Sequence, residues 1–139
     1  MQGNLWINAS HPTRRSTIMP ITEEEKRKYA WEKARKVEGF DDTLFRKDAC
    51  GAWIMWDKYG NRENSLGWEI DYILPLSKGG PDELFNIRAL QYQNKASKKN
   101  DYPSYTAVVT AEGTSNIRMI RNLTINKQAR ERLKEYETL

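Results

Sequence analysis

Hydrophobic positions near the start of the chain follow the spacing of an amphipathic helix. The stretch ITEEEKRKYAWEKARKV, residues 21–37, keeps its apolar residues on one face at intervals of three and four. Thr22 and Glu25 form an S/T-x-x-E capping box in front of that face, and acidic residues fill the first turn. We therefore expect a helix that begins here and that Gly39 ends.

The middle of the chain changes to short apolar runs that are typical of strands. Two extended segments, roughly 51–56 and 68–73, are rich in Trp and Ile and are separated by Gly and Asn turn signals. PLSKGGPDELFN, residues 75–86, contains only loop signals. The apolar run 87–90 predicts a short strand, and the good helix formers of 91–100 predict a helix. The expected order is strand, loop, short strand and helix.

The last third of the chain predicts a second hairpin and a final helix. YTAVVTAEGTSNIRMI alternates like a strand pair that turns around Glu112 and Gly113. Residues 126–137 then return to helical spacing. Residues 1–20 show no periodicity and are interpreted as a loose leader, while 21–139 has the length of one domain. The pattern as a whole predicts an α+β domain.

Composition narrows the classes of protein that the chain can belong to. Hydrophobic residues make up 38% and charged residues 30% of 139 residues, which is typical of a folded, water-soluble chain. The net charge of +4 is compatible with a polyanionic partner. Cys50 is the single cysteine, which excludes an internal disulfide and a structural zinc site of paired cysteines. Without an apolar membrane span or a secretory signal, we expect a cytoplasmic protein.

Three polar residues fall at ordered places in the predicted strand, loop, strand and helix. Asp71 ends the first strand, Asn86 lies in the loop and Asn94 lies on the helix, with Gly-Trp before the strand and Lys-Gly-Gly in the loop. Through these residues the segment 46–101 resembles the HNH endonuclease family. The resemblance implies a ββα-metal core over 67–101, to which an N-terminal helix, a β-hairpin and a C-terminal helix are added.

The same resemblance implies roles for the motif residues. Asp71 and Asn94 match the positions that hold one divalent metal, and Asn86 matches the residue that braces the loop and positions the general base. Mg²⁺ or Mn²⁺ is the implied ion, in a single weak site, because such ions prefer oxygen ligands and keep several waters. In the family, the metal neutralises charge on the scissile DNA phosphate while a histidine takes a proton from water.

The chain departs from the family at the histidine that follows the aspartate, where it has Tyr72. A phenol with a pKa near ~10 is about 0.1% ionised at neutral pH, so it is a poor base. General-base catalysis contributes about 10²–10⁴ in rate. We therefore expect a DNA-binding protein with impaired or absent nuclease activity, unless a metal or a lysine lowers the phenol pKa by several units. The single histidine, His11, lies in the leader, and the sequence leaves open whether Tyr72 is natural or introduced.

Basic residues around the motif are candidates for contact with a nucleic-acid backbone. On a helix, Asn94 and Lys98 share a face, which would bring an ammonium close to a phosphate at the metal. The alternative is an ordinary solvated helix face. The candidates are Lys95, Lys98, Lys99, Arg88 and Lys78, followed by Arg14, Arg15 and Arg46.

Two other functions remain open from the sequence. The chain could be a former nuclease that now acts as a protein-interaction or inhibitor module, for example against a nucleic-acid-targeting defence enzyme. It could also be a sequence-independent nucleic-acid-binding module. Dependence on salt separates them, because phosphate-driven binding weakens steeply as salt rises and a hydrophobic protein interface does not.

Overall fold

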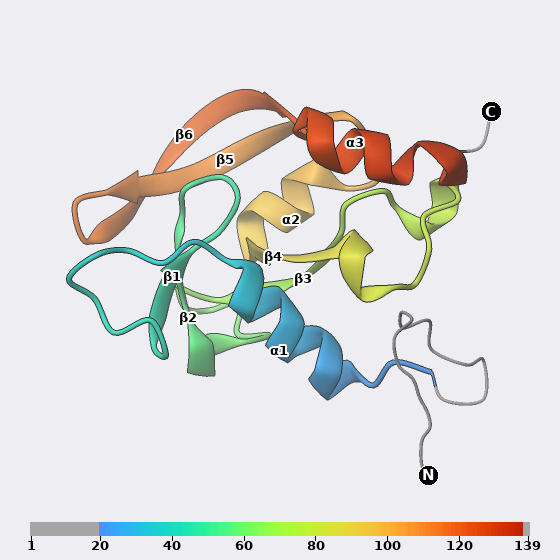
Figure 1. Cartoon of the computed structure of the whole chain (residues 1–139). Coiled ribbons are helices and arrows are strands. Elements are labelled where there is room, and N and C mark those ends of the chain that lie inside the picture. Colours follow the sequence, from blue (N-terminus) through green and yellow to red (C-terminus); the bar gives the residue numbers. More distant parts are fainter. Residues whose placement is uncertain (1–19, 138–139) are drawn as a thin grey trace, which may run out of the picture.

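A computed structural model describes residues 20–137 of the chain (Figure 1). Within this range the protein is a mixed α+β fold with three α-helices and three antiparallel sheets of two strands each. The elements in order are α1 (Glu23–Lys33), β1 (Phe45–Lys47), β2 (Trp53–Met55), β3 (Trp68–Tyr72), β4 (Ile87–Gln91), α2 (Tyr92–Lys98), β5 (Ser104–Glu112), β6 (Ser115–Thr124) and α3 (Lys127–Leu133). None of the described helices is both long enough and apolar enough to cross a membrane.

Helix α1 begins at the predicted capping box. The Thr22 hydroxyl accepts a hydrogen bond from the Glu25 amide at 3.0 Å, and the Glu25 carboxylate accepts one from the Thr22 amide at 2.9 Å. Two of the amides that a helix start leaves without partners are satisfied in this way. The predicted helix start is confirmed.

The predicted end of this helix at Gly39 is wrong. Helix α1 ends at Lys33, and Ala34 is already extended with ψ at 159°. Arg35 then exchanges two backbone hydrogen bonds of 2.9 Å with Lys47 in a β-bridge. A residue in such a bridge has an extended backbone. The pairing of Arg35 with Lys47 therefore ends the helix before Gly39, the end that the sequence predicts.

The two predicted strands of the middle region are present, but they belong to different sheets. Strand β2 pairs with β1, and β3 pairs with β4. Strand β1 was not predicted, because three residues are too few to show a period of two. The order strand, loop, strand and helix is present as β3, β4 and α2.

The β3–β4 hairpin lies between two helices, with α1 on one face and α2 on the other (Figure 1). Its register sets Asp71 opposite Arg88 and Tyr72 opposite Ile87. Because side chains alternate between the faces of a strand pair, Asp71 and Arg88 share one face while Tyr72 and Ile87 share the other. This alternation separates the neighbouring motif residues Asp71 and Tyr72.

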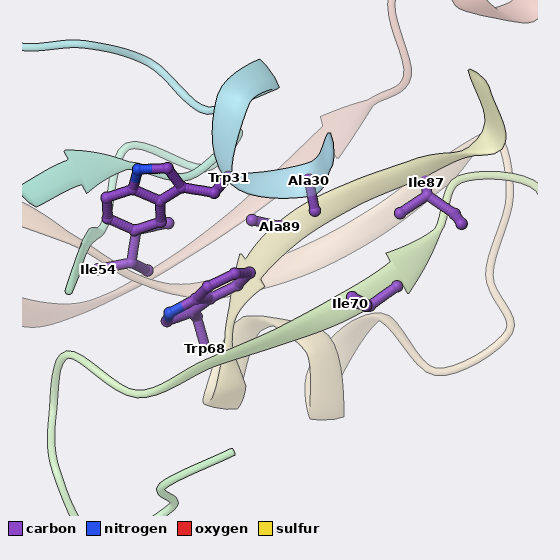
Figure 2. Packing of buried hydrophobic residues seen from close by; sticks show 7 residues of the cluster. All are labelled: Ala30, Trp31, Ile54, Trp68, Ile70, Ile87 and Ala89. Atoms are coloured by element: carbon purple, nitrogen blue, oxygen red, sulfur yellow. The ribbon is translucent and has the colours of Figure 1, made fainter. Parts of the chain in front are cut away.

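The face toward α1 is apolar and forms the first core cluster (Figure 2). Trp68 is fully buried, and its ring lies 5.5 Å from that of Trp31 on α1. The members of this cluster are Ala30, Trp31, Ile54, Trp68, Ile70, Ile87 and Ala89. A second cluster under the β5–β6 hairpin contains Cys50, Leu90, Tyr105, Ala107 and Ile125.

The two predicted elements of the last third are confirmed. Strands β5 and β6 form an antiparallel hairpin that turns between Glu112 and Ser115, with Gly113 at a φ of 62°. Helix α3 starts after Asn126, whose side chain accepts a hydrogen bond from the Ala129 amide at 2.8 Å. The leader assigned to 1–20 lies outside the described residues except for its last position.

Candidate functional site

Asp71 lies on β3 with its carboxylate paired to two cations. Its Oδ2 accepts a hydrogen bond from Arg88 Nε at 2.9 Å, and its Oδ1 lies 3.4 Å from Lys98 Nζ. Arg88 comes from the facing position of β4, and Lys98 comes from α2. The carboxylate is only 3% exposed, so these two partners replace the water that a surface carboxylate would have.

Lys98 is fully buried, and its ammonium points inward. Besides facing Asp71, the Nζ donates a hydrogen bond to the Tyr72 carbonyl oxygen at 3.1 Å. Burial lowers the pKa of Lys98, and the charge of Asp71 opposes that change. The phosphate contact predicted for Lys98 receives no support from this orientation.

Asn94 is also fully buried, and its side chain joins α2 to β5. Its Oδ1 accepts hydrogen bonds from the amides of Val108 and Val109 at 2.8 and 2.9 Å. Its Nδ2 donates to the Val109 carbonyl at 3.0 Å and to Asp48 Oδ2 at 3.1 Å. Two donors and two accepted bonds use the full hydrogen-bonding capacity of a carboxamide. This is a structural role.

Asp48 organises the interior around Asn94, a role that was not predicted from the sequence. Its carboxylate accepts four hydrogen bonds of 2.8 to 3.1 Å, from the amides of Cys50, Ala52 and Gln91 and from Asn94 Nδ2. Burial raises the pKa of Asp48, while these four donors favour the ionised form. The two local bonds were foreseeable because Asp commonly binds amides that follow it in a turn. The bonds from Gln91 and Asn94 could not be predicted, because both residues lie more than 40 positions away in the chain.

The predicted ligands Asp71 and Asn94 do not fit a shared metal ion in this arrangement. A magnesium ion needs oxygen lone pairs directed at one point, at ~2.0–2.1 Å. Both oxygens of Asp71 face cations, and the oxygen of Asn94 is occupied by two amides. Residues 20–137 also contain no cluster of three His, Cys, Asp or Glu side chains suited to a metal. The predicted Mg²⁺ or Mn²⁺ site therefore remains a prediction without support from these contacts.

Tyr72 is held by a charged pair on the opposite face of the hairpin from Asp71. Its hydroxyl accepts a hydrogen bond from Lys26 Nζ at 2.9 Å and donates one to Asp82 Oδ1 at 2.9 Å. Burial raises the pKa of Tyr72; the Lys26 bond opposes this effect and the Asp82 bond adds to it. The phenol is therefore protonated at neutral pH, and its proton points to Asp82. Lys26 and Asp82 were not predicted as partners of Tyr72. Lys26 lies 46 residues away in the chain, and Asp82 lies in the loop between β3 and β4.

Asn86 braces the loop that joins β3 to β4. Its fully buried side chain accepts a hydrogen bond from the Leu74 amide at 2.9 Å and donates to the carbonyls of Leu74 and Pro81 at 2.9 and 3.0 Å. Gly80 is required in the same loop, because a Cβ there would lie 1.8 Å from the Leu74 carbonyl oxygen. These contacts fix the loop backbone, while the positioning of a general base by Asn86 stays a prediction.

A hollow of about 200 Å³ opens beside Asp71 and Tyr72, between the loop after β3 and helix α2. We call it the α2 hollow. Lys95 and Lys99 line it, and both side chains reach the surface. Its full lining is Asp71, Tyr72, Pro75, Leu76, Ser77, Lys95, Lys99 and Asn100. Of the three lysines predicted on this helix, two therefore face the hollow and one lies inside the fold.

The other predicted basic contacts are dispersed. Lys78 is exposed at the end of a short 3-10 turn, outside the lining of the α2 hollow. The Arg88 guanidinium is mostly buried, 5.1 Å from the Tyr105 ring. Arg46 is 7% exposed, and its guanidinium donates to three backbone carbonyls at the end of α1 and in the following loop. Neither arginine lines the α2 hollow, and Arg14, Arg15 and His11 lie outside the described residues.

The candidate site thus consists of the α2 hollow, the two lysines that line it, and the buried ion cluster of Asp71, Arg88 and Lys98 beside it. The protonated Tyr72 hydroxyl is held on the other face of the hairpin. Comparisons of the chain with models of protein families, with curated proteins and with solved structures find no match. The indications of function therefore lie in these side chains and their contacts.

Proposed function

We propose that this chain is an HNH endonuclease-like protein that binds the DNA backbone but hydrolyses it poorly or not at all. The observation that carries the proposal is the state of Tyr72. Its hydroxyl is hydrogen-bonded between Lys26 and Asp82, and its pKa is raised rather than lowered. A general base must be unprotonated and have a pKa near the working pH. The phenol, which is protonated at neutral pH and has a raised pKa, meets neither condition.

Backbone binding is supported by the charges around the α2 hollow. Lys95 and Lys99 line the hollow, and the Lys95 Nζ lies 3.9 Å from Glu69 Oε1. The four cations Arg88, Lys95, Lys98 and Lys99 outnumber the two carboxylates Asp71 and Glu69 that pair with them. Lysine ammonium groups are common partners of nucleic-acid phosphates, and such contacts do not depend on base sequence. The hollow therefore suits a phosphate group, in a protein whose net charge is +4.

The proposal is tested by measuring duplex and single-stranded DNA binding over a range of salt. The wild type should bind, and log Kd should rise with log salt. A Lys95→Ala/Lys99→Ala double variant should bind more weakly and lower the salt slope by about 1 for each lysine removed. The matched control is Lys28→Ala/Lys134→Ala, which removes two exposed lysines outside the hollow and should change little. Equal losses in both double variants would show that binding follows net charge and not this site.

A plasmid-nicking assay with Mg²⁺ and with Mn²⁺ tests the other half of the proposal. The wild type should nick no faster than an Asp71→Ala variant. Metal-dependent nicking by the wild type that Tyr72→Phe abolishes would overturn the assignment of an inactive phenol. A wild type that binds no DNA at low salt would instead favour the protein-interaction module.

A further inference from the structure

The cluster of Asp71, Arg88 and Lys98 has one more positive than negative charge. The carboxylate pairs with Arg88 Nε at 2.9 Å and with Lys98 Nζ at 3.4 Å. Lys98 is fully buried, and Asp71 is 3% exposed. Charges are kept inside a protein only when partners offset the loss of water. Here the partners come from the chain itself, one from each side of the carboxylate.

A divalent ion at this carboxylate would have to share it with the two cations. An ion at Oδ1 would lie ~2.0–2.1 Å from an oxygen that already has an ammonium 3.4 Å away. At Oδ2 it would displace the Arg88 hydrogen bond. Repulsion between cations at such distances is strong in a site with little water. The cluster therefore opposes binding of a metal by its charge as well as by its geometry.

The cluster of Asp71, Arg88 and Lys98 lies next to the α2 hollow. Asp71, Lys95 and Lys99 line the α2 hollow, while Lys98 is buried outside its lining with its Nζ 3.4 Å from Asp71 Oδ1. A phosphate in the hollow would lie beside the Asp71 carboxylate, whose negative charge Arg88 and Lys98 already neutralise. A nuclease of this general kind uses a bound metal for that neutralisation.

We propose that the Lys98 ammonium is a built-in cation that takes the place of a divalent metal at Asp71. The chain then binds no divalent ion there, and a phosphate can enter the α2 hollow without one. The second part rests on the proposed function, whereas the first part concerns the chain alone.

The first experiment uses Mn²⁺ alone, without nucleic acid, and measures bound ion by electron paramagnetic resonance. The wild type and Asp71→Asn should both bind no more than weakly. Lys98→Ala should gain one Mn²⁺ site that is at least ~10-fold tighter, and Lys98→Ala/Asp71→Asn should lose it again. Lys95→Ala is the matched control, because it removes a neighbouring lysine but leaves both partners of Asp71 in place. It should behave as the wild type.

Two results would overturn the inference. One is a stoichiometric Mn²⁺ site in the wild type that Asp71→Asn abolishes, which can be measured even if Lys98→Ala does not fold. The other is a folded Lys98→Ala variant that gains no site.

A second experiment measures DNA binding by the wild type in EDTA and in Mg²⁺ at equal ionic strength. The two Kd values should agree within about 2-fold. Binding that needs the metal would overturn metal-independent entry of phosphate. Absence of DNA binding in both buffers would reject the proposed function, and with it the entry of a phosphate into the α2 hollow. The Mn²⁺ experiment would still decide whether Lys98 replaces a metal at Asp71.

Discussion

The two faces of the β3–β4 hairpin are stabilised in different ways, although both are formed by the same ten residues of β3 and β4. The face toward α1 carries Trp68, Ile70, Ile87 and Ala89 in a cluster of apolar side chains (Figure 2). The face toward α2 carries the Asp71–Arg88 pair, which Lys98 completes. One face is stabilised by removal of apolar surface from water, and the other by ion pairs and hydrogen bonds between buried polar groups. Within the described residues, Arg88 Nη2 is a buried atom of this face that has no hydrogen-bond partner.

This difference has a consequence for how each face responds to change. Apolar packing is non-directional, so a slightly smaller side chain loses only a part of the contact energy. A buried polar group loses its partner entirely when that partner is removed, and the unpaired group then keeps its full desolvation cost. The α2 face should therefore be much more sensitive to single substitutions than the α1 face.

The largest effect is expected from Asp48→Ala, since Asp48 accepts four hydrogen bonds inside the α2 side of the fold. Each buried donor left without a partner costs about 1–3 kcal/mol, so the free energy of unfolding should fall by at least about 4 kcal/mol. Urea denaturation followed by tryptophan fluorescence measures this loss. Asp57→Ala, at an exposed aspartate, should stay within about 0.5 kcal/mol of the wild type. A loss below about 2 kcal/mol for Asp48→Ala would show that water or relaxation satisfies these amides.

The faces can be compared directly with two neighbouring substitutions on β3. Asp71→Ala leaves Arg88 and Lys98 without their anion and should cost about 3–4 kcal/mol. Ile70→Val, one residue away and on the α1 face, should cost about 0.5–1.5 kcal/mol. Asp71→Asn/Lys98→Met should recover part of the loss, because it removes one charge of each sign. Equal costs for Asp71→Ala and Ile70→Val would remove the contrast between the faces.

Much of the fold could be predicted from the sequence because its signals are local. The capping box at Thr22, the turn at Gly113 and the helix formers after Gln91 each act within a few residues, and the elements they predict are present. The end of α1 and strand β1 could not be predicted. The end of α1 is followed by the bridge between Arg35 and Lys47, and β1 forms by pairing with β2 over only three residues. These pairings join segments that leave no joint pattern in the sequence.

The site could be predicted less well, for a related reason. Helical spacing correctly predicted that Asn94 and Lys98 share a face of α2, and both side chains are buried. The spacing cannot tell whether that face points to solvent or inward. Its direction is set by β5 and by Asp48, 46 residues before Asn94 in the chain. The partner of Tyr72 on α1, Lys26, is also 46 residues away and left no local signal.

Alkaline pH should act first through Cys50, which belongs to the cluster on the α2 side. Burial raises the pKa of this thiol from 9.0 to about 12. In the unfolded chain the thiol loses its proton near pH 9, while the folded chain keeps it, so the folded state binds more protons and its stability falls as pH rises. The free energy of unfolding should fall by about 1 kcal/mol between pH 9 and 10 from this group.

Cys50→Ala isolates that contribution. The variant should be less stable at neutral pH because it loses buried volume, but its stability should change less between pH 9 and 10. Urea denaturation at closely spaced pH values measures the two slopes. Tyr105, whose pKa is raised from 10.0 to about 12 mainly by burial, should act mainly above pH 10 and therefore outside this interval. Parallel slopes for the wild type and Cys50→Ala would contradict the raised thiol pKa.

The smallest effect is expected from Tyr72→Phe, which removes only the hydroxyl between Lys26 and Asp82. Both bonds lie at a partly exposed site, where water can replace them, and the Lys26–Asp82 ion pair at 3.2 Å can persist without the phenol. The free energy of unfolding should fall by about 0.5–1 kcal/mol. Tyr29→Phe is the matched control, since the Tyr29 ring contacts Lys33 while its hydroxyl has no hydrogen-bond partner within the described residues.

A double-mutant cycle of Tyr72→Phe with Lys26→Met separates the hydroxyl bond from other effects of each substitution. The bond raises the pKa of Lys26, so the coupling energy should be present at neutral pH and should decline as pH rises above 10.5, where the ammonium loses its proton. A Tyr72→Phe variant that equals both the wild type and Tyr29→Phe in stability would show that the charged pair does not hold the phenol. Apolar packing would then be the remaining stabilisation of the α1 face. The main support for an inactive Tyr72 hydroxyl would be lost.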